Sequence, residues 1–283
     1  MTDDPKPEPA PGFPKHAARP GRPAAFFDLD KTIIAKSSTL AFSRPFYAGG
    51  LITRGSVLRS AYAQFVYLVG GADHDQMEKM REYLSDLSAG WDVQTVRDIV
   101  ADTLHHIVDP LVYDEAVSLI EEHQLEGRDV IIVSASGAEV VEPIGEMLGA
   151  DAVIATRMEV EDGKYTGAIG FYAYAQNKAS AIEELAREKG YDLSRSYAYS
   201  DSVTDVHMLE IVGHPYAVNP DRELRRIAAS RGWPVLWFTR PVALTRRMRL
   251  PSSRPTLAAI ALGTAASVGG AVYLAARRRA TRA

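Results

Sequence analysis

Two aspartates that stand one residue apart, Asp28 and Asp30, end a short apolar segment near the start of the chain. The segment Ala24–Leu29 has the length and composition of a strand that is buried on both faces of a parallel sheet. Carboxylates at this spacing repel each other, and one of them takes up a proton unless a cation lies nearby. The pair therefore predicts a buried strand that ends beside a divalent metal, and a reaction in which charge develops.

Strands and helices alternate between about residue 109 and residue 239. The pattern predicts helices at Val112–His123, Ala138–Leu148 and Lys178–Lys189. It predicts strands at Asp129–Ser134, Ala152–Ala155, Ser196–Tyr199, Tyr216–Val218 and Val235–Phe238. A β-hairpin is expected over Met158–Tyr172, with Asp162-Gly163 at its turn. This alternation is typical of an α/β core in which helices cover both faces of a parallel sheet.

Residues 38–108 interrupt the alternation with a helical pattern. Apolar residues fit a helix face at Phe42, Phe46 and Tyr47, and two further helices are expected over 57–68 and 77–84. A fourth helix is expected over Val93–Ile107, with Asp92 as its N-cap. The sequence thus predicts a helical insert between the first strand and the rest of the core.

The two ends of the chain differ from this core. Residues 1–22 are rich in proline and lack the apolar region of a secretory signal, so a disordered leader is expected. Thr256–Ala276 is uncharged and lies between a basic linker, 240–255, and a basic tail, 277–283. At 1.5 Å per residue this apolar segment is long enough to cross a bilayer. We expect a C-terminal transmembrane helix; the alternative is a helix that packs on the body or lies on the membrane surface.

Charge is divided along the chain. The stretch from Arg240 to Ala283 holds nine arginines and no acidic residue, so subtracting these from the net charge of −4 leaves −13 on residues 1–239. An acidic body argues against a nucleic-acid partner. The basic end favours an anionic surface, most simply a membrane. The absence of cysteine excludes a disulfide-linked partner, a thiolate metal site and a cysteine nucleophile.

Four groups of polar residues follow predicted strands or open a helix at the edge where α/β sheets place their sites. A carboxylate there can attack phosphorus, and a second can act as general acid and base. Hydroxyls, helix N-terminal amides and a lysine can bind phosphate oxygens, and a third carboxylate completes an oxygen site suited to Mg²⁺. The groups are Asp28 and Asp30 with Thr32, then Ser134, then Lys178, then Asp201 with Asp205.

These motifs resemble, in order and spacing, those of the haloacid dehalogenase-like phosphohydrolases, in the branch similar to phosphoserine phosphatase. The resemblance covers about residues 24–239. It implies a three-layer Rossmann-like core of residues 23–37 and 109–239, a β-hairpin flap, and a helical cap domain of residues 38–108 between the first and second motifs. The matching segments are Asp28-Leu-Asp30-Lys-Thr32, Ser134-Ala-Ser, Lys178 and Ser200-Asp201-Ser-Val-Thr-Asp205.

The resemblance also implies roles for the residues. Asp28 is the nucleophile that forms an aspartyl-phosphate, and Asp30 is the general acid and base. An acid at position 30 is typical of the phosphatases within this superfamily. Mg²⁺ is held by Asp28, by the backbone carbonyl of Asp30 and by Asp201, and Asp205 orients Lys178 or a metal-bound water. The phosphate and substrate ligands are Thr32, Ser134, Ala135 and Lys178.

The sequence departs from this pattern in two places. Phosphoserine phosphatases carry a glutamate nine residues after the nucleophile, where this chain has Ser37, so phosphoserine is not the expected substrate. Ser202, Val203 and Thr204 replace a glycine-rich segment that includes an asparagine, which predicts a tighter pocket. The whole pattern, with its leader and basic tail, resembles a membrane-associated branch found in actinobacteria.

The expected function is Mg²⁺-dependent hydrolysis of a small phosphorylated metabolite by a cytoplasmic domain anchored to the membrane. One alternative is a lipid-phosphate phosphatase, which the anchor and the aromatic residues of the insert suggest. Another is a membrane-bound regulatory protein of the same fold that affects cell division or differentiation, with catalysis incidental.

Overall fold

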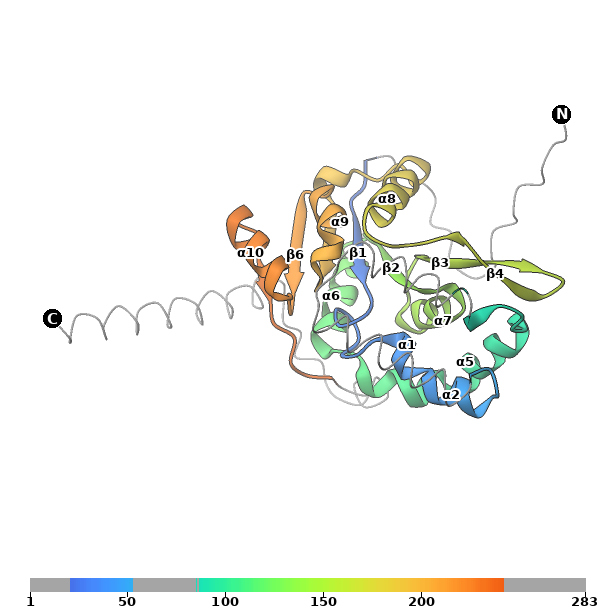
Figure 1. Ribbon diagram of the computed structural model, residues 1–283. Coiled ribbons are helices and arrows are strands. Elements are labelled where there is room, and N and C mark those ends of the chain that lie inside the picture. Colours follow the sequence, from blue (N-terminus) through green and yellow to red (C-terminus); the bar gives the residue numbers. More distant parts are fainter. Residues whose placement is uncertain (1–20, 53–84, 86, 242–283) are drawn as a thin grey trace, which may run out of the picture.

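The computed structural model describes residues 21–52, 85 and 87–241 (Figure 1). A seven-stranded sheet runs through this part of the chain in the order β4-β3-β2-β1-β5-β6-β7. Neighbouring strands are parallel except β3 and β4, which are antiparallel. The strands are β1 (Ala24–Asp28), β2 (Asp129–Gly137), β3 (Ala152–Glu161), β4 (Lys164–Phe171), β5 (Tyr197–Ser200), β6 (His214–Val218) and β7 (Val235–Leu236).

Helices cover both faces of the sheet, as the alternation predicts (Figure 1). Because successive strand residues point to opposite faces, Ala25 and Phe27 of β1 join one buried cluster, and Ala24 and Phe26 join the other. The first cluster includes side chains from α5, α6 and α7, and the second from α8, α9 and α10. These helices are α5 (Val93–Val108), α6 (Asp114–Leu125), α7 (Ala138–Leu148), α8 (Gln176–Lys189), α9 (Val206–Glu210) and α10 (Arg222–Arg231).

Strand β1 is the point where the strand order reverses. From β1 the sheet continues through β2 and β3 on one side and through β5, β6 and β7 on the other. All five residues of β1 are buried, as the apolar segment predicts. In open α/β sheets, the crevice at such a switch point, beyond the carboxyl ends of the strands, is where ligands bind. The ends of β1, β2 and β5 therefore face this crevice.

The β-hairpin is longer than its sequence pattern predicts. The separate strand expected at Ala152–Ala155 is wrong, because β3 runs unbroken to Glu161 and forms both that strand and the first arm of the hairpin. Asp162 and Gly163 turn the chain with φ of 49° and 76°. Such positive φ values are those of the tight turns that join two antiparallel strands.

Three helices represent the predicted insert in the described residues: α1 (Ser38–Ala41), α2 (Ser43–Ala48) and α5. The single helix expected around Phe42 is wrong in two respects: it is divided at Phe42, and Tyr47 is 40% exposed instead of sharing the buried face. The fourth helix is confirmed, and Asp92 caps it by accepting a hydrogen bond from Thr95 N at 2.7 Å. The second and third expected helices lie outside the described residues.

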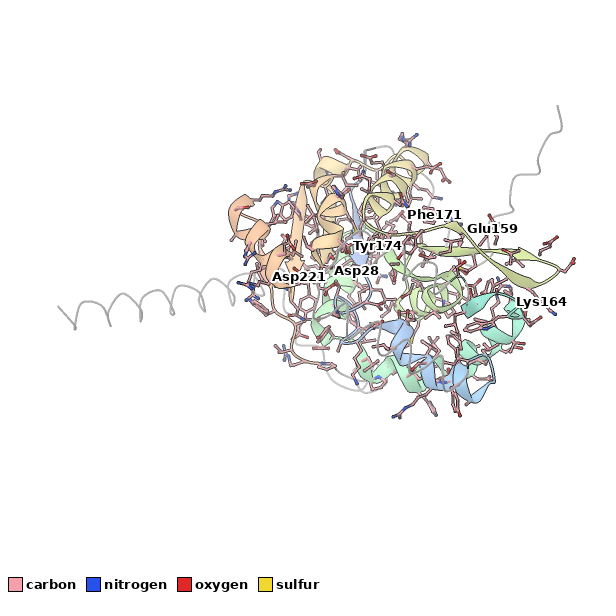
Figure 2. The ribbon with its side chains drawn as sticks, in the orientation of Figure 1. Asp28, Glu159, Lys164, Phe171, Tyr174 and Asp221 are labelled. Atoms are coloured by element: carbon pink, nitrogen blue, oxygen red, sulfur yellow. The ribbon has the colours of Figure 1, made fainter. Side chains whose placement is uncertain are left out.

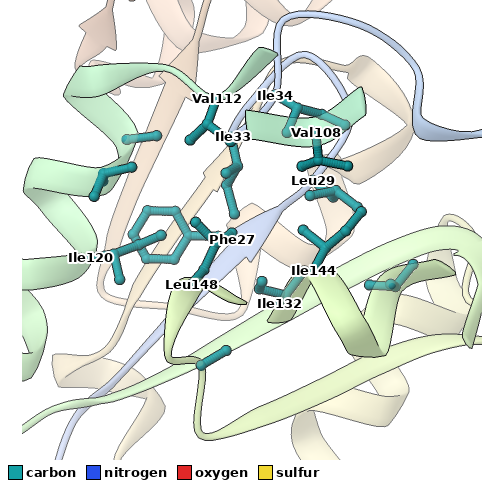
Figure 3. Close-up of a cluster of buried hydrophobic side chains, with 14 of the residues drawn as sticks. Phe27, Leu29, Ile33, Ile34, Val108, Val112, Ile120, Ile132, Ile144 and Leu148 are labelled. Atoms are coloured by element: carbon teal, nitrogen blue, oxygen red, sulfur yellow. The ribbon is translucent and has the colours of Figure 1, made fainter. Parts of the chain in front are cut away.

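Helix α5 packs into the core of the sheet. Its buried residues Val100, Leu104 and Val108 lie in the same cluster as Phe27 of β1 and Ile144 of α7. Figure 3 shows Val108 beside Leu29, the residue that follows β1, with Ile144 of α7 in the same group of side chains. This part of the insert therefore helps to form the hydrophobic core. The proposed limits of a cap domain, 38–108, stay a prediction.

The folded core begins before the predicted end of the leader. Arg22 forms an ion pair with Asp129 of β2 and lies over the ring of Tyr191, 5.4 Å from its centroid. Residues 1–20 of the leader and everything from residue 242 on, including the predicted apolar segment, lie outside the described residues. Within the described ranges, none of the helices combines the length and the apolar character that a membrane crossing requires.

Candidate active site

The predicted site residues lie on elements that meet at the switch point of the sheet. Asp28 is the last residue of β1, and Ser134 lies near the end of the neighbouring β2. Asp201 follows directly on β5, the other neighbour of β1. Lys178 lies in the first turn of α8 and its Nζ contacts Asp28. Figure 2 labels Asp28 and, near it in this view, Tyr174, which comes two residues before α8.

Lys178 joins two of the predicted carboxylates. Its Nζ donates to Asp28 Oδ1 at 2.7 Å and to Asp205 Oδ2 at 2.8 Å, and the lysine is only 2% exposed. Ser200 Oγ donates to the same oxygen of Asp205 at 2.7 Å. Burial alone would lower the pKa of Lys178, but the carboxylates of Asp205 and Asp28 outweigh burial and raise this pKa above its ordinary value. The ammonium therefore stays charged at this end of the sheet.

The ionised forms of Asp28 and Asp201 are not fully compensated by charges of the described residues. Burial raises the pKa of Asp28 to about 7, although Lys178 opposes the shift. Burial, together with the negative charge of Asp28, raises the pKa of Asp201 to about 8. Lys31 Nζ lies 3.9 Å from Asp201 Oδ2, but its side chain is 57% exposed, so solvent screens its charge. Both carboxylates would gain from a further cation.

Asp30 is held by Ser38, which lies outside the named motifs, and by Ser136, which ends the Ser134-Ala-Ser segment but was given no role there. Its Oδ1 accepts a hydrogen bond from Ser38 N at 2.8 Å, and its Oδ2 accepts one from Ser136 Oγ at 3.3 Å. Ser136 Oγ is also 2.7 Å from Ser38 Oγ. Burial raises the pKa of Asp30, and the hydrogen bonds from Ser38 and Ser136 oppose that rise. The only sequence signal for Ser136 is its place two residues after Ser134.

The predicted phosphate ligands lie buried around this edge. Ser134 Oγ accepts a hydrogen bond from Ser136 N at 3.1 Å, which fixes the bend at the end of β2. Ala135 O accepts one from Thr156 Oγ1 at 2.7 Å. Thr32 is fully buried, and within the described part of the chain its Oγ1 has no hydrogen-bond partner. A buried hydroxyl without a partner is costly unless a ligand satisfies it.

The donor set fits a hard divalent cation. Among the described residues, no three side chains of His, Asp or Glu are grouped to hold a metal, and the predicted set contains only two such side chains, Asp28 and Asp201. Mg²⁺ binds one or two carboxylates and keeps several waters. Two buried carboxylates with raised pKa values suit such an ion, and the third predicted ligand is the backbone carbonyl of Asp30.

A cavity of about 560 Å³ lies elsewhere, at the amino end of β6. Its lining includes His214, Tyr216, Arg231 and Trp233. None of the predicted site residues contributes to it. They lie at the carboxyl ends of the parallel strands, whereas the cavity lies at the amino end of β6. The cavity is therefore separate from the candidate active site.

This fold, with carboxylates and a buried lysine at the switch point, defines a hydrolase of the haloacid dehalogenase class. Residues 25–210 match the family described as haloacid dehalogenase-like hydrolase. That stretch includes every motif of the site. The chain belongs to this family.

Similar proteins cover nearly the whole chain. A protein of Streptomyces azureus named "Inhibition of morphological differentiation protein" is 66% identical over 265 residues, which cover 92% of this chain and 95% of that protein. A probable phosphatase of Mycobacterium tuberculosis is 58% identical, and the match covers 95% of this chain and 94% of that protein. A phosphoserine phosphatase of the same organism is 33% identical, and the match covers 92% of this chain and 82% of that protein.

Solved structures share the fold. A protein of unknown function from Bordetella pertussis matches with a TM-score of 0.68 and 29% identity, covering 76% of this chain and 98% of its own. A phosphoserine phosphatase, solved as an analogue of its phospho-aspartyl intermediate, matches with a TM-score of 0.56 over 82% of this chain and 100% of its own. Its identity is 20%, so this second match is a likeness of fold alone.

Proposed function

We propose that the protein is a Mg²⁺-dependent phosphatase that hydrolyses a phosphomonoester through an aspartyl-phosphate on Asp28. The observation that carries this proposal is the buried contact of Lys178 with both Asp28 and Asp205 at the end of β1. It places a fixed positive charge beside a carboxylate at the switch point, which an attack on a phosphate dianion needs. The family is one of hydrolases, and two relatives are named as phosphatases.

In the first step a carboxylate oxygen of Asp28 attacks phosphorus, and the bond from phosphorus to the leaving alcohol breaks. Lys178 holds Oδ1, which leaves the other oxygen for the attack. Asp30 gives its proton to the leaving oxygen, and its raised pKa favours the protonated form that this step needs. The products of the step are the free alcohol and the phosphorylated Asp28.

In the second step water attacks phosphorus, and Asp30 takes up the proton that water releases. Phosphate leaves, and the Asp28 carboxylate is restored. Lys178, Ser134 and the Thr32 hydroxyl, which has no partner among the described residues, bind the phosphate oxygens through both steps. Mg²⁺, held by Asp28, Asp201 and the backbone carbonyl of Asp30, would neutralise the carboxylates and the phosphate so that they can approach.

The substitution Asp28→Asn tests the nucleophile. The new side-chain amide keeps an oxygen that can accept from Lys178, so the variant should fold, but this amide cannot attack phosphorus. We expect no measurable hydrolysis of p-nitrophenyl phosphate in excess Mg²⁺, and a circular dichroism spectrum like that of the wild type. Turnover by this variant at a rate near the wild-type rate would overturn the proposal.

The substrate is proposed to be a small phosphorylated metabolite. Ser37 stands where phosphoserine recognition needs a carboxylate, so phosphoserine should be a poor substrate. A panel of phosphoserine, sugar phosphates and lysophosphatidate, assayed with and without Mg²⁺, compares the classes directly. A clear preference for lysophosphatidate would favour the lipid-phosphate alternative, and a preference for phosphoserine would contradict the inference from Ser37.

A regulatory role is a second candidate function. It is supported by the 66% identity to a protein named for inhibition of morphological differentiation, which the match covers almost from end to end. In that case the fold binds a phosphorylated ligand or a partner, and hydrolysis is incidental. Complementation of a deletion strain with Asp28→Asn separates the two: full rescue favours regulation, and failure favours catalysis.

The proposed location is a cytoplasmic catalytic domain held at the membrane by the C-terminal segment. The support is the uncharged stretch of residues 256–276 and the nine arginines from Arg240 onward. Flotation of the full chain with vesicles that contain anionic lipids, against a chain ending at residue 241, tests it. Equal flotation of both chains would contradict it.

A further inference from the structure

Asp221 is the N-cap of α10, and it also contacts the loop that carries Asp201. As a cap, its Oδ1 accepts hydrogen bonds from Glu223 N at 2.9 Å and Leu224 N at 2.7 Å. Its second oxygen, Oδ2, accepts one from Val203 N at 2.8 Å. One oxygen of this carboxylate therefore caps α10, and the other binds the loop that carries Asp201.

The backbone of Asp221 also holds this loop. Asp221 N donates to Asp201 O at 2.8 Å. Together with the bond to Val203 N, this contact brackets the loop residues 201–203. Figure 2 labels Asp221, the N-cap of α10, and Asp28 at the end of β1. Strand β5, which leads into the loop, lies between β1 and β6 in the sheet.

The position of the Asp201 carboxylate depends on this loop backbone. Asp201 is 7% exposed, and Lys31 Nζ, at 3.9 Å from Oδ2, is too far for a hydrogen bond. The loop itself is short: Ser202 begins the 3₁₀ turn Val203–Asp205, and Ser202 N donates to Ser200 Oγ at 3.3 Å. A change in the backbone at Val203 would therefore move the Asp201 carboxylate.

We propose that Asp221 is a positioning residue for Asp201, and that it sets the affinity of the Asp28–Asp201 site for a divalent cation. This inference rests on the proposed function, in which Asp201 is a metal ligand. Partners that orient metal ligands typically change metal affinity by roughly 10–100-fold when they are removed. Asp221 thus connects the N-terminus of α10 to the loop that carries Asp201.

The two tasks of Asp221 can be separated by substitution. Asn is as good an N-cap as Asp, so Asp221→Asn can keep the bonds to Glu223 N and Leu224 N through its one carbonyl oxygen. The amide NH₂ then faces Val203 N, and it cannot accept a hydrogen bond. Asp221→Ala removes both tasks. Asp92→Ala is the matched control, because Asp92 caps α5 through Thr95 N and, in the part of the chain that the structure describes, its hydrogen bonds reach no site residue.

The experiment is a Mg²⁺ titration of the metal-free full chain by isothermal calorimetry, together with thermal unfolding in EDTA and in Mg²⁺. We expect Asp221→Asn to bind Mg²⁺ at least about ten-fold more weakly while its melting temperature in EDTA stays near the wild-type value. Steady-state rates should fall at low Mg²⁺ and recover partly when Mg²⁺ is raised. Asp92→Ala should lower the melting temperature and leave the Mg²⁺ affinity unchanged.

Two results would overturn the inference. The first is a Mg²⁺ affinity of Asp221→Asn and Asp221→Ala within about two-fold of the wild-type affinity, well short of the range for such partners. The second is a loss of affinity in Asp92→Ala that matches the loss in Asp221→Ala, since general destabilisation would then explain both. A wild-type chain that binds no Mg²⁺, or turnover by Asp28→Asn, would instead refute the proposed function, and the role of Asp221 would fall with it.

Discussion

The ammonium group of Lys178 lies between two carboxylates in a site that solvent hardly reaches. Its Nζ contacts Asp28 and Asp205, and all three side chains are almost fully buried. Loss of one partner from a buried ion pair costs roughly 3–5 kcal/mol, because it leaves a buried charge without compensation. Lys178 should therefore matter for stability as well as for phosphate binding.

Lys178→Met keeps an unbranched side chain of similar length and removes the charge. We expect it to lower the free energy of unfolding by about 3 kcal/mol near pH 8. The loss should be smaller near about pH 5, because Asp28, with its pKa raised to about 7, is then protonated and needs no cation. Urea unfolding at both pH values measures this, with Lys189→Met at the exposed end of α8 as the control. Equal losses at the two pH values would contradict the charge argument.

Ser136 is expected to control the protonation of Asp30. Its hydroxyl donates to Asp30 Oδ2, and such a bond favours the ionised carboxylate. Ser136→Ala should therefore raise the pKa of Asp30 further and lower kcat by roughly ten-fold, since Asp30 must act as both acid and base. In the pH profile of kcat, the limb that reports the ionisation of Asp30 should move to higher pH. Ser230→Ala, on the exposed face of α10, is the control, and an unshifted profile for Ser136→Ala would contradict this role.

At the scale of elements, the sequence predicts most of the core and misses details that depend on tertiary contacts. The helix at Ala138–Leu148 has the predicted bounds, because its apolar periodicity and the glycine after it are local signals. The continuous strand β3 was not predicted, since its continuity depends on pairing with both β2 and β4. The division of the expected helix at Phe42 was likewise not predicted, and the structure buries Phe42 fully in the core.

The site shows the same division. The positions of Asp28, Ser134, Lys178 and Asp201 at this end of the sheet could be predicted, because each stands next to a recognisable strand or helix end. Their roles stay a prediction. Their partners could not be predicted: Ser38 and Ser136 lie 98 residues apart, and Asp221 lies 18 residues from Val203. Hydrogen bonds between such distant residues leave no periodic pattern in the sequence.

Helix α7 packs closely on β3 at Gly145. A Cβ at this position would lie 2.7 Å from Val153 Cγ2, so Gly145→Ala must displace either the helix or the stiff valine side chain. We expect a loss of about 1–3 kcal/mol in the free energy of unfolding. The double variant Gly145→Ala/Val153→Ala should lose less than the two single losses added together. Strict additivity in urea unfolding would show that this contact does not limit the packing of α7.

At the scale of the whole molecule, both ends of the described chain are fixed to the core. Arg22 is tied to Asp129 and Tyr191. At the other end, Glu115 Oε1 accepts a hydrogen bond from Thr239 N at 3.1 Å, and Arg240 O accepts one from Asp114 N at 2.9 Å. Both ends of the described part are therefore held against the core. A separate feature of the fold is the excess of negative charge that the ionised carboxylates of Asp28 and Asp201 bring to the switch point.

That excess makes a pH-dependent prediction for the metal-free protein. The pKa values of Asp28 and Asp201 are raised in the folded state to about 7 and about 8, from an ordinary value of 3.8. The stability that these carboxyl groups contribute is therefore fully present below about pH 4 and is lost as the pH rises through 7 to 8. In EDTA, the free energy of unfolding should fall by at most about 1.4 kcal/mol per pH unit for each group.

Mg²⁺ should reverse this loss, because a ligand that binds only the folded state stabilises it in proportion to the logarithm of its concentration. Urea unfolding near pH 8 should therefore show a large gain on adding Mg²⁺, and the gain should shrink near about pH 5, where protons compete with the metal. Asp201→Asn removes one of the two carboxylates at almost constant shape, so its stability in EDTA should fall less steeply with pH and should respond little to Mg²⁺. If the variant and the wild type respond to pH and Mg²⁺ alike, the excess charge lies elsewhere in the acidic body, and Asp201 is not a ligand of the cation.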